Sequence, residues 1–363
     1  MKKTSIRISD GRELIYYDSD ETAIRTAVDQ RQLPELQVTS EMRYDPLLGE
    51  WVVIASHRQS RTFLPPTSRC PLCPSSSDNH TEIPEADYDI VVFENRFPSL
   101  AMGILGIDQS VRLDERLIGR RPARGRCEVV VFTSDHDQSF SELPVARVRE
   151  VIDVWADRTA DLSAMPGIAQ VFPFENCGIE IGVTLNHPHG QIYALPFVTP
   201  KTERMLNNAR RYRDETGRSL FADLVDAERR LGDRIVATNA NWTAFVPAAA
   251  RWPVEVHLYP HRQTPDLTEL TPEERNDFAE LYLLILKKLD SLYERRLPYI
   301  AAWHQAPVSL DRDLAHLHLE IFSVQRSADK LKYLAGTESG MGVWISDVTP
   351  EHIAATLRSA TIR

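Results

Sequence analysis

The chain has 363 residues, of which 42% are hydrophobic and 26% are charged, and its 42 basic and 52 acidic residues give a formal net charge of -10. This length is sufficient for one large core or for two or three average domains, and the acidic excess argues against bulk affinity for nucleic acid phosphates. We find no apolar run near the roughly 18 residues that span a bilayer, and no apolar stretch after the two N-terminal lysines, so we expect a cytosolic protein without a membrane segment or a secretory signal.

The apolar period of the first half of the chain changes from that of strands to that of a helix and back again. Residues 1–40 are polar and acidic, and we expect them to be an N-terminal extension. Runs rich in Val, Ile and aromatic residues then predict strands over 50–56, 88–93 and 127–132. From residue 145 apolar residues recur every three or four positions, which predicts a helix to about residue 161. Two further strands are predicted over 168–174 and 179–185.

The second half repeats this order. Strands are predicted over 234–239, 254–260, 298–303 and 316–322, and Thr271-Pro-Glu-Glu274 has the pattern of a capping box that begins a long helix. His187-Pro-His189-Gly-Gln-Ile in the first half corresponds to His316-Leu-His318-Leu-Glu-Ile in the second. We therefore expect an α+β protein of two related halves, 41–200 and 201–363, with a mainly antiparallel sheet and helices packed on it.

Cys70-Pro-Leu-Cys73 is the clearest local motif. Two thiolates at this spacing can bind one tetrahedral ion, with two further ligands from elsewhere in the chain, for which His is the expected type. A surface loop without a ligand is the main alternative. A redox pair is less favoured, because such pairs sit at the start of a helix and Pro74 follows here. Cys127 and Cys177 are expected to be core thiols.

The second motif is His187-Pro-His189-Gly-Gln191. In an extended segment alternate side chains face the same way, so the two histidines and the glutamine can converge on one site. A purely structural histidine pair is the alternative reading. Pro188 removes a backbone donor and Gly190 permits close approach of another group, and both features favour a functional site in which one histidine binds metal and the other is a nucleophile.

Two weaker signals accompany these motifs. Arg58 and Arg61 can bind phosphate oxygens with paired hydrogen bonds, although a solvated turn would contain the same residues. Lys332 and Tyr333 precede a glycine-containing loop of the kind that brings backbone amides to a ligand.

Nine ordered motifs between about Arg43 and Asp347 resemble the galactose-1-phosphate uridylyltransferase family of the histidine triad superfamily: RYDPLLGEW, SHRQSR, CPLC, VFENRFP, FENCG, HPHGQI, WHQAP, HLHLEIF and KYLAGTESG. The resemblance implies a nucleophile at His189 and one structural zinc ion held by Cys70, Cys73, His136 and His187. It also implies two groups of substrate-binding residues and a homodimer with shared active sites. The nucleotide group is Arg58, Arg61, Asn95, Asn176, Thr184 and Gln191, and the group that reaches substrate from a partner subunit is Lys332, Tyr333 and Glu338.

The implied reaction moves UMP from UDP-glucose to galactose 1-phosphate through a uridylyl-histidine. Gln191 agrees with transfer, because histidine triad hydrolases have a third His there whose imidazolium can protonate a leaving group and later assist water. The alternatives are a nucleotide-sugar phosphorylase of the same superfamily, using ADP- or UDP-sugars, and a zinc-stabilised nucleotide-sugar binder without turnover.

Two departures from the family pattern limit the resemblance. Some members hold a second metal with three histidines and a Glu. The histidines are matched here by His304, His316 and His318, but the position of the Glu is Met205 in this chain. A second iron or zinc ion is therefore in doubt, and a hydrogen-bonded histidine cluster is the alternative. Thr184 stands where Ser is frequent and Arg96 where Asp is common, so we expect a slightly altered nucleotide position.

Overall fold

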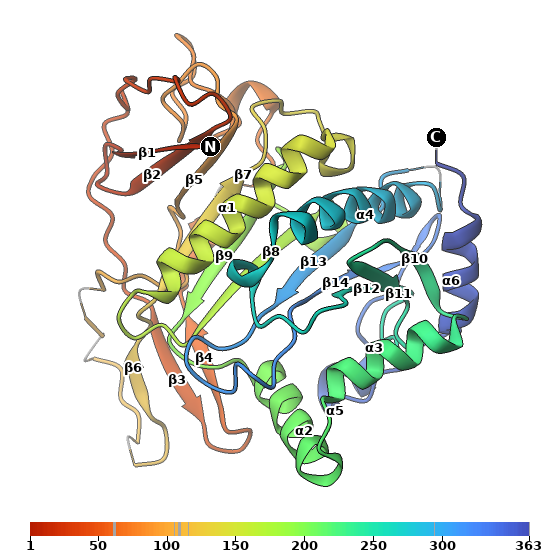
Figure 1. Ribbon diagram of the computed structural model, residues 1–363. Coiled ribbons are helices and arrows are strands. Elements are labelled where there is room, and N and C mark those ends of the chain that lie inside the picture. The colour runs from red at the N-terminus through yellow and green to blue at the C-terminus, as the bar shows by residue number, and fades with distance from the viewer. Residues whose placement is uncertain (61–62, 105, 108–109, 115, 294, 363) are drawn as a thin grey trace. The chain divides into compact units, whose positions relative to one another are not determined.

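The computed structural model describes residues 1–60, 63–104, 106–107, 110–114, 116–293 and 295–362 (Figure 1). The fold is α+β, as predicted, and the chain forms two compact units. The first unit comprises Met1–Gln138, Arg158–Pro173 and Thr184–Lys201, and the second comprises Ser139–Asp157, Phe174–Val183 and Thr202–Arg363. Helix α1 (Val145–Ser163) and strand β8 (Gln170–Cys177) contribute residues to both units.

The first unit is built on antiparallel strands in the order β1-β2-β5-β7-β9, and a separate small sheet has the order β4-β3-β6. The bounds are β1 (Lys2–Arg7), β2 (Glu13–Asp18), β3 (Glu41–Asp45), β4 (Glu50–Ile54), β5 (Ile90–Glu94), β6 (Arg120–Pro122), β7 (Arg126–Val131) and β9 (His189–Leu195). The strands predicted near residues 50, 90 and 127 are therefore confirmed.

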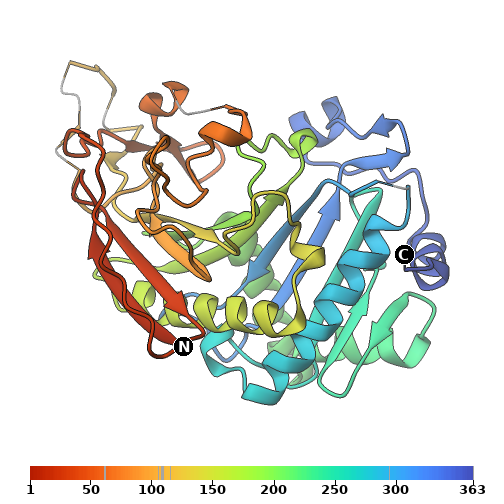
Figure 2. The ribbon, with the colours of Figure 1, turned by 90° about the horizontal axis from the view of Figure 1, so that it is seen from above.

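The first 18 residues differ from the predicted extension. Strands β1 and β2 form a hairpin, seen side by side in red in Figure 2, and β2 pairs with β5 so that Leu14 lies opposite Phe93. Leu14 and Tyr16 are fully buried in one apolar cluster with Phe93 and Leu72. The short apolar run of β2 is surrounded by polar sequence, which concealed its strand pattern.

The second unit is built on antiparallel strands in the order β13-β14-β12-β11-β10, and the end of β8 pairs with β13. The remaining strands are β10 (Ile235–Thr238), β11 (Trp242–Phe245), β12 (Val254–Pro260), β13 (Tyr299–His304), β14 (His318–Ser323), β15 (Gln325–Ser327) and β16 (Lys330–Leu331). The remaining helices are α2 (Pro200–Thr216), α3 (Leu220–Leu231), α4 (Pro272–Asp290), α5 (Gly336–Met341) and α6 (Pro350–Ser359).

Helix α4 begins as its capping box predicts. The Thr271 hydroxyl accepts from the Glu274 backbone N–H at 3.2 Å, and the Glu274 carboxylate accepts from the Thr271 N–H at 2.9 Å. Phe278, Ile285 and Leu289 are buried on one face of the helix. The capping box therefore identified the start of this helix, and the 3.6-residue apolar period identified its packed side.

The two halves share a local hydrogen-bond pattern. In the first half His189 Nδ1 bonds the His187 carbonyl at 2.7 Å, and His187 Nε2 bonds the Thr133 carbonyl at 2.7 Å. In the second half His318 Nδ1 bonds the His316 carbonyl at 2.8 Å, and His316 Nε2 bonds the Pro260 carbonyl at 3.0 Å. The repeat seen in the sequence is therefore a repeat of structure, whereas the boundaries at residues 40 and 200 stay predictions.

The strand predicted over 179–185 is wrong. Ile179–Ile181 forms a single 3-10 turn, bracketed by Gly178 at φ +94° and Gly182 at φ +83°. A left-handed backbone at both glycines interrupts an extended chain, so the apolar pattern here belongs to a turn.

Among the helices of the described residues, none has both the length and the apolar character that a membrane span needs.

Candidate active site and metal centre

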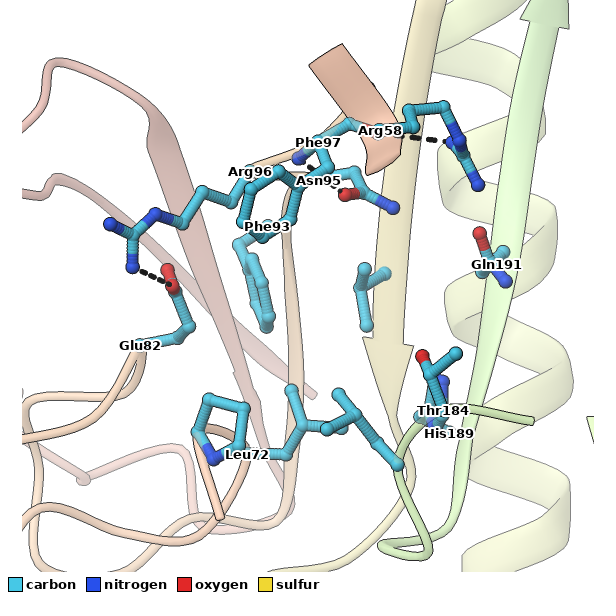
Figure 3. A pocket seen from close by; sticks show the side chains of 13 residues that line it. Arg58, Leu72, Glu82, Phe93, Asn95, Arg96, Phe97, Thr184, His189 and Gln191 are labelled. Carbon is cyan, nitrogen blue, oxygen red and sulfur yellow. Dashed lines mark hydrogen bonds and ion pairs between the residues drawn. The ribbon is translucent and has the colours of Figure 1, made fainter. Parts of the chain in front are cut away.

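Strand β9 presents the histidine motif to a pocket in the first unit. His189 lies opposite Val131 of β7 and Gln191 opposite Val129, so both side chains occupy the same face of β9. In Figure 3, Gln191 lies above His189, Thr184 is drawn next to His189, and Arg58 lies beyond Gln191. The pocket is lined by Arg58, Pro71, Leu72, Glu82, Phe93, Asn95, Arg96, Phe97, Val129, Thr184, Leu185, His189 and Gln191.

The imidazole of His189 is held in one tautomer. A carbonyl oxygen can only accept, so Nδ1 carries the proton that is donated to the His187 carbonyl at 2.7 Å. Burial lowers the pKa of His189, while the bond to that carbonyl acts in the opposite direction. The ring is therefore neutral near pH 7, and Nε2 holds a lone pair that can act as a nucleophile.

Arg58 brings a fixed positive charge to the pocket. Its Nη1 donates to the Phe97 carbonyl at 3.0 Å and to the Ser99 hydroxyl at 2.8 Å. These bonds orient the guanidinium, which suits it to an anionic ligand. Arg61, its predicted companion, lies outside the described residues.

The opposite wall is formed by the loop after β5 and by Glu82. Asn95 Oδ1 accepts from the Phe97 N–H at 2.8 Å, which fixes the turn that follows the strand. Arg96 lies 3.9 Å from the Glu82 carboxylate, and in Figure 3 this pair is on the side of the pocket away from His189, with Phe93 between. Glu82 and Phe93 were not singled out from the sequence, because neither belongs to a motif of chemically active residues.

Four predicted metal ligands meet next to this pocket. The donor atoms of Cys70, Cys73, His136 and His187 all lie within 4.8 Å of one another. Cys73 Sγ is 3.4 Å from His136 Nδ1 and 3.5 Å from His187 Nδ1, and Cys70 Sγ is 3.9 Å from His187 Nδ1.

The donor set fits a tetrahedral zinc ion. Ordinary zinc–sulfur and zinc–nitrogen bond lengths place sulfur and nitrogen ligands about 3.6 Å apart, close to the three distances observed here. His187 Nε2 donates to the Thr133 carbonyl, so Nδ1 is unprotonated and faces the thiols. Burial raises the pKa of Cys73 to about 12 and lowers that of His187 to about 4 in the protein without an ion.

The second predicted histidine group differs from its expected composition. His304, His318 and Glu320 form the group that can hold an ion, whereas the donors of His316 are not part of it. His316 Nε2 bonds the Pro260 carbonyl, and its buried Nδ1 has no hydrogen-bond partner among the described residues. In this group Glu320, which follows His318 on the same face of β14, takes the place of the predicted His316, because His316 precedes the strand and its Nε2 bonds the Pro260 carbonyl. Glu320 is 3.2 Å from His304 Nε2 and 3.8 Å from His318 Nε2, an arrangement that also forms without an ion.

The other predicted substrate residues lie in the second unit. Asn176 is on β8, paired with Ile300 of β13. Lys332 and Glu338 are buried and form an ion pair at 3.3 Å, whereas Tyr333 is 80% exposed. None of these four residues is among those that line the pocket of the first unit.

A singly protonated histidine, a fixed arginine and an amide in one pocket can carry out group transfer at phosphorus, with the histidine as nucleophile and the other two as donors to the phosphoryl oxygens. The fold and the site together define an α+β transferase. Residues 30–199 match the galactose-1-phosphate uridyl transferase N-terminal domain, and residues 205–362 match the C-terminal domain. The chain therefore belongs to the galactose-1-phosphate uridylyltransferase family.

Individual relatives agree with this assignment. Galactose-1-phosphate uridylyltransferase of Streptomyces lividans is 45% identical, with 99% of this chain and 98% of the relative aligned. A solved uridylyltransferase is 35% identical with a TM-score of 0.77, covering 88% of this chain and 98% of its own. A solved ADP-glucose phosphorylase from Arabidopsis thaliana, 23% identical with a TM-score of 0.68, shares the fold over 90% of this chain and 100% of its own.

Proposed function

We propose that this protein transfers UMP from UDP-glucose to galactose 1-phosphate, giving glucose 1-phosphate and UDP-galactose. The observation that carries the proposal is the tautomer of His189, whose unprotonated Nε2 lies in a pocket with Arg58 and Gln191. The similarity to galactose-1-phosphate uridylyltransferases over 99% of the chain supports the choice of substrates.

The proposed reaction has two displacements at one phosphorus. His189 Nε2 attacks the α-phosphorus of UDP-glucose, forming a nitrogen–phosphorus bond as the bond to glucose 1-phosphate breaks. An oxygen of galactose 1-phosphate then attacks the same phosphorus, and the histidine leaves with its electron pair. Arg58 and the Gln191 amide offset the charge that develops on the phosphoryl oxygens.

Gln191 favours transfer over hydrolysis. An amide cannot supply the proton that a poor leaving group needs, but a sugar phosphate leaves without protonation. An amide also cannot act as a general base toward water. The uridylyl-histidine is therefore expected to survive until a sugar phosphate arrives.

We further propose one structural zinc ion per chain at Cys70, Cys73, His136 and His187. A bound ion would fix the His187 backbone, whose carbonyl orients the imidazole of His189. Such thiolate ligands persist in a reducing compartment, which supports our proposal of a cytosolic protein.

We also propose a homodimer in which the segment of Lys332, Tyr333 and Glu338 contributes to the partner's site, with Tyr333 as its exposed side chain and the buried Lys332–Glu338 ion pair holding the segment in place. Large apolar side chains are exposed around α5, as expected of a subunit contact: Tyr333, Leu334, Met341, Val343 and Ile345. Sedimentation should show a dimer that Met341→Glu weakens, and a wild-type monomer at micromolar concentration would contradict this proposal.

Initial rates test the transfer reaction. We expect UDP-galactose to form, with parallel double-reciprocal lines when both substrates are varied. Intersecting lines would require a ternary complex and would contradict the covalent route. Turnover with inorganic phosphate but not with galactose 1-phosphate would favour a phosphorylase, and binding of UDP-glucose without any turnover would favour a simple binder.

A further inference from the structure

The N-terminal segment, residues 1–40, is joined to the wall of the pocket by two arginines. Arg12 is buried and donates through Nη2 to Glu82, through Nη1 to the Glu94 carbonyl at 2.8 Å and through Nε to Asp10 at 2.8 Å. Glu94 immediately precedes Asn95 and Arg96, and these two residues and Glu82 line the pocket. Arg12 thus connects both parts of the wall opposite His189.

Arg31 reaches the same carboxylate from a second position in the segment. Its Nη1 lies 2.9 Å from Glu82 Oε1, while Nε and Nη2 donate to Asp29 at 2.9 and 2.8 Å. Asp29 accepts in turn from the backbone N–H and hydroxyl of Ser9 at 3.0 and 2.9 Å. The Arg31 guanidinium is therefore fixed by its own segment before it meets Glu82.

Arg31 and Arg96 compete for one oxygen of Glu82. Arg96 Nη1 is 3.9 Å from Oε1, the atom that Arg31 contacts at 2.9 Å, and Arg12 already donates to Oε2. A buried carboxylate needs close positive partners, and two of the three come from residues 1–40. With these two bonds made, the Arg96 guanidinium lies beside Glu82 at an ion-pair distance that is longer than a hydrogen bond, at the edge of the pocket that Arg96 lines (Figure 3).

We propose that residues 1–40 are a positioning element of the active site, in which Arg12 and Arg31 hold Glu82 and thereby keep the Arg96 guanidinium available to the nucleoside part of the substrate. This inference rests on the proposed function. When the α-phosphorus is at His189, we assign the nucleoside to the side of the pocket that holds Phe93 and Arg96, because an aromatic ring suits a base and a guanidinium suits the acceptor oxygens of ribose and base. Without Arg31, Glu82 Oε1 would accept a hydrogen bond from Arg96 in its place, which would hold the guanidinium on the carboxylate.

The test separates the two halves of the transfer reaction. In a ping-pong scheme kcat/KM for each substrate reports only its own half-reaction, and the nucleoside is tethered to His189 throughout the second half. Arg31→Gln should therefore lower kcat/KM for UDP-glucose about tenfold, as expected for one charge-assisted contact. The kcat/KM for galactose 1-phosphate should change less than about twofold, because tethering replaces nucleoside binding.

A double variant and a matched control complete the test. Arg31→Gln added to Arg96→Gln should cause no further loss, since Arg31 acts through Arg96. Arg25→Gln breaks another anchor of the same segment, to Asp18 and the Asp87 carbonyl, and should leave both kcat/KM values unchanged.

Four outcomes would overturn the inference. Two concern Arg31→Gln itself: wild-type kinetics, or an equal loss of kcat/KM for both substrates. The third is that the effects of Arg31→Gln and Arg96→Gln add in the double variant, and the fourth is that Arg25→Gln loses as much kcat/KM as Arg31→Gln does. The proposed function itself is contradicted if the wild-type protein does not use UDP-glucose, and this inference is then contradicted as well.

Discussion

The Nδ1–H of His189 donates to the backbone carbonyl of His187 at 2.7 Å, while the His187 side chain turns its own Nδ1 to within 3.5 Å of Cys73 Sγ. One residue therefore belongs to the candidate metal centre through its side chain and to the pocket through its backbone. Because the carbonyl fixes the tautomer of His189, displacement of His187 would misorient the proposed nucleophile as well as remove a proposed zinc ligand.

Loss of a zinc ligand should accordingly lower both stability and activity. We expect about one zinc ion per wild-type chain and, in Cys73→Ser, loss of the ion, a fall in unfolding free energy on the order of several kcal/mol and at least about a tenfold loss of transfer activity. Metal analysis, thermal unfolding and initial rates measure these effects. Cys177→Ser is the matched control and should keep its zinc. A Cys73→Ser protein without zinc but with wild-type activity would contradict the coupling.

Replacement of Gln191 by His should shift the reaction toward hydrolysis. An imidazole there can protonate the leaving group and activate water, so release of glucose 1-phosphate without an acceptor should rise at least about tenfold in Gln191→His. The measurement is glucose 1-phosphate released from UDP-glucose, with Gln191→Asn as the amide control. Equal hydrolysis in the two variants would show that the amide does not limit attack by water.

Burial of Glu175 predicts a pH dependence of stability. Burial raises the pKa of Glu175 from near 4.5 to about 8, with the Tyr282 hydroxyl donating to it at 3.4 Å. The unfolded chain releases this proton at lower pH than the folded chain does. The contribution of Glu175 to the free energy of unfolding is therefore complete below about pH 4.5 and is lost as pH rises toward 8.

Denaturant titrations at pH 5 and pH 8 test this dependence. The fall in unfolding free energy between the two values should be smaller in Glu175→Gln than in wild type. Glu215→Gln, at an exposed position of α2, should keep the wild-type fall. Parallel curves for wild type and Glu175→Gln would show that Glu175 is ionised in the folded protein.

In the turn that replaces the predicted strand over 179–185, substitution of one glycine should lower the free energy of unfolding more than substitution of the other. A Cβ at Gly178 would lie 2.7 Å from Pro298 Cβ, whereas a Cβ at Gly182 meets nothing within 4 Å. Gly178→Ala should cost about 2–4 kcal/mol, from backbone strain plus a clash, and Gly182→Ala about 1–2 kcal/mol, from strain alone. Equal losses in urea unfolding would show that the Pro298 contact relaxes freely.

Local chemistry made much of the site predictable. Cys70, Cys73, His187 and His189 lie in two short motifs whose spacing limits where their side chains can point. Helix α4 was equally clear, because its cap and its apolar period agree.

Other features depend on distant partners and left no local signal. Arg12 and Arg31 meet Glu82 because segments far apart in the sequence lie together in the fold, and nothing near any of the three residues indicates that contact. His316 was expected near His304 from the resemblance to the family, yet β14 begins only at His318, and the imidazole of His316 bonds the Pro260 carbonyl instead.

A single-turnover trap tests the central claim most directly. Wild-type protein is mixed with UDP-glucose labelled in the α-phosphate, without an acceptor, and His189→Ala is treated in parallel. We predict label on the wild-type protein that is stable to base but not to acid, with glucose 1-phosphate released in equal amount, and no label on His189→Ala. Rapid formation of UDP-galactose by wild-type protein that never acquires label, or label retained by His189→Ala, would contradict His189 as the nucleophile.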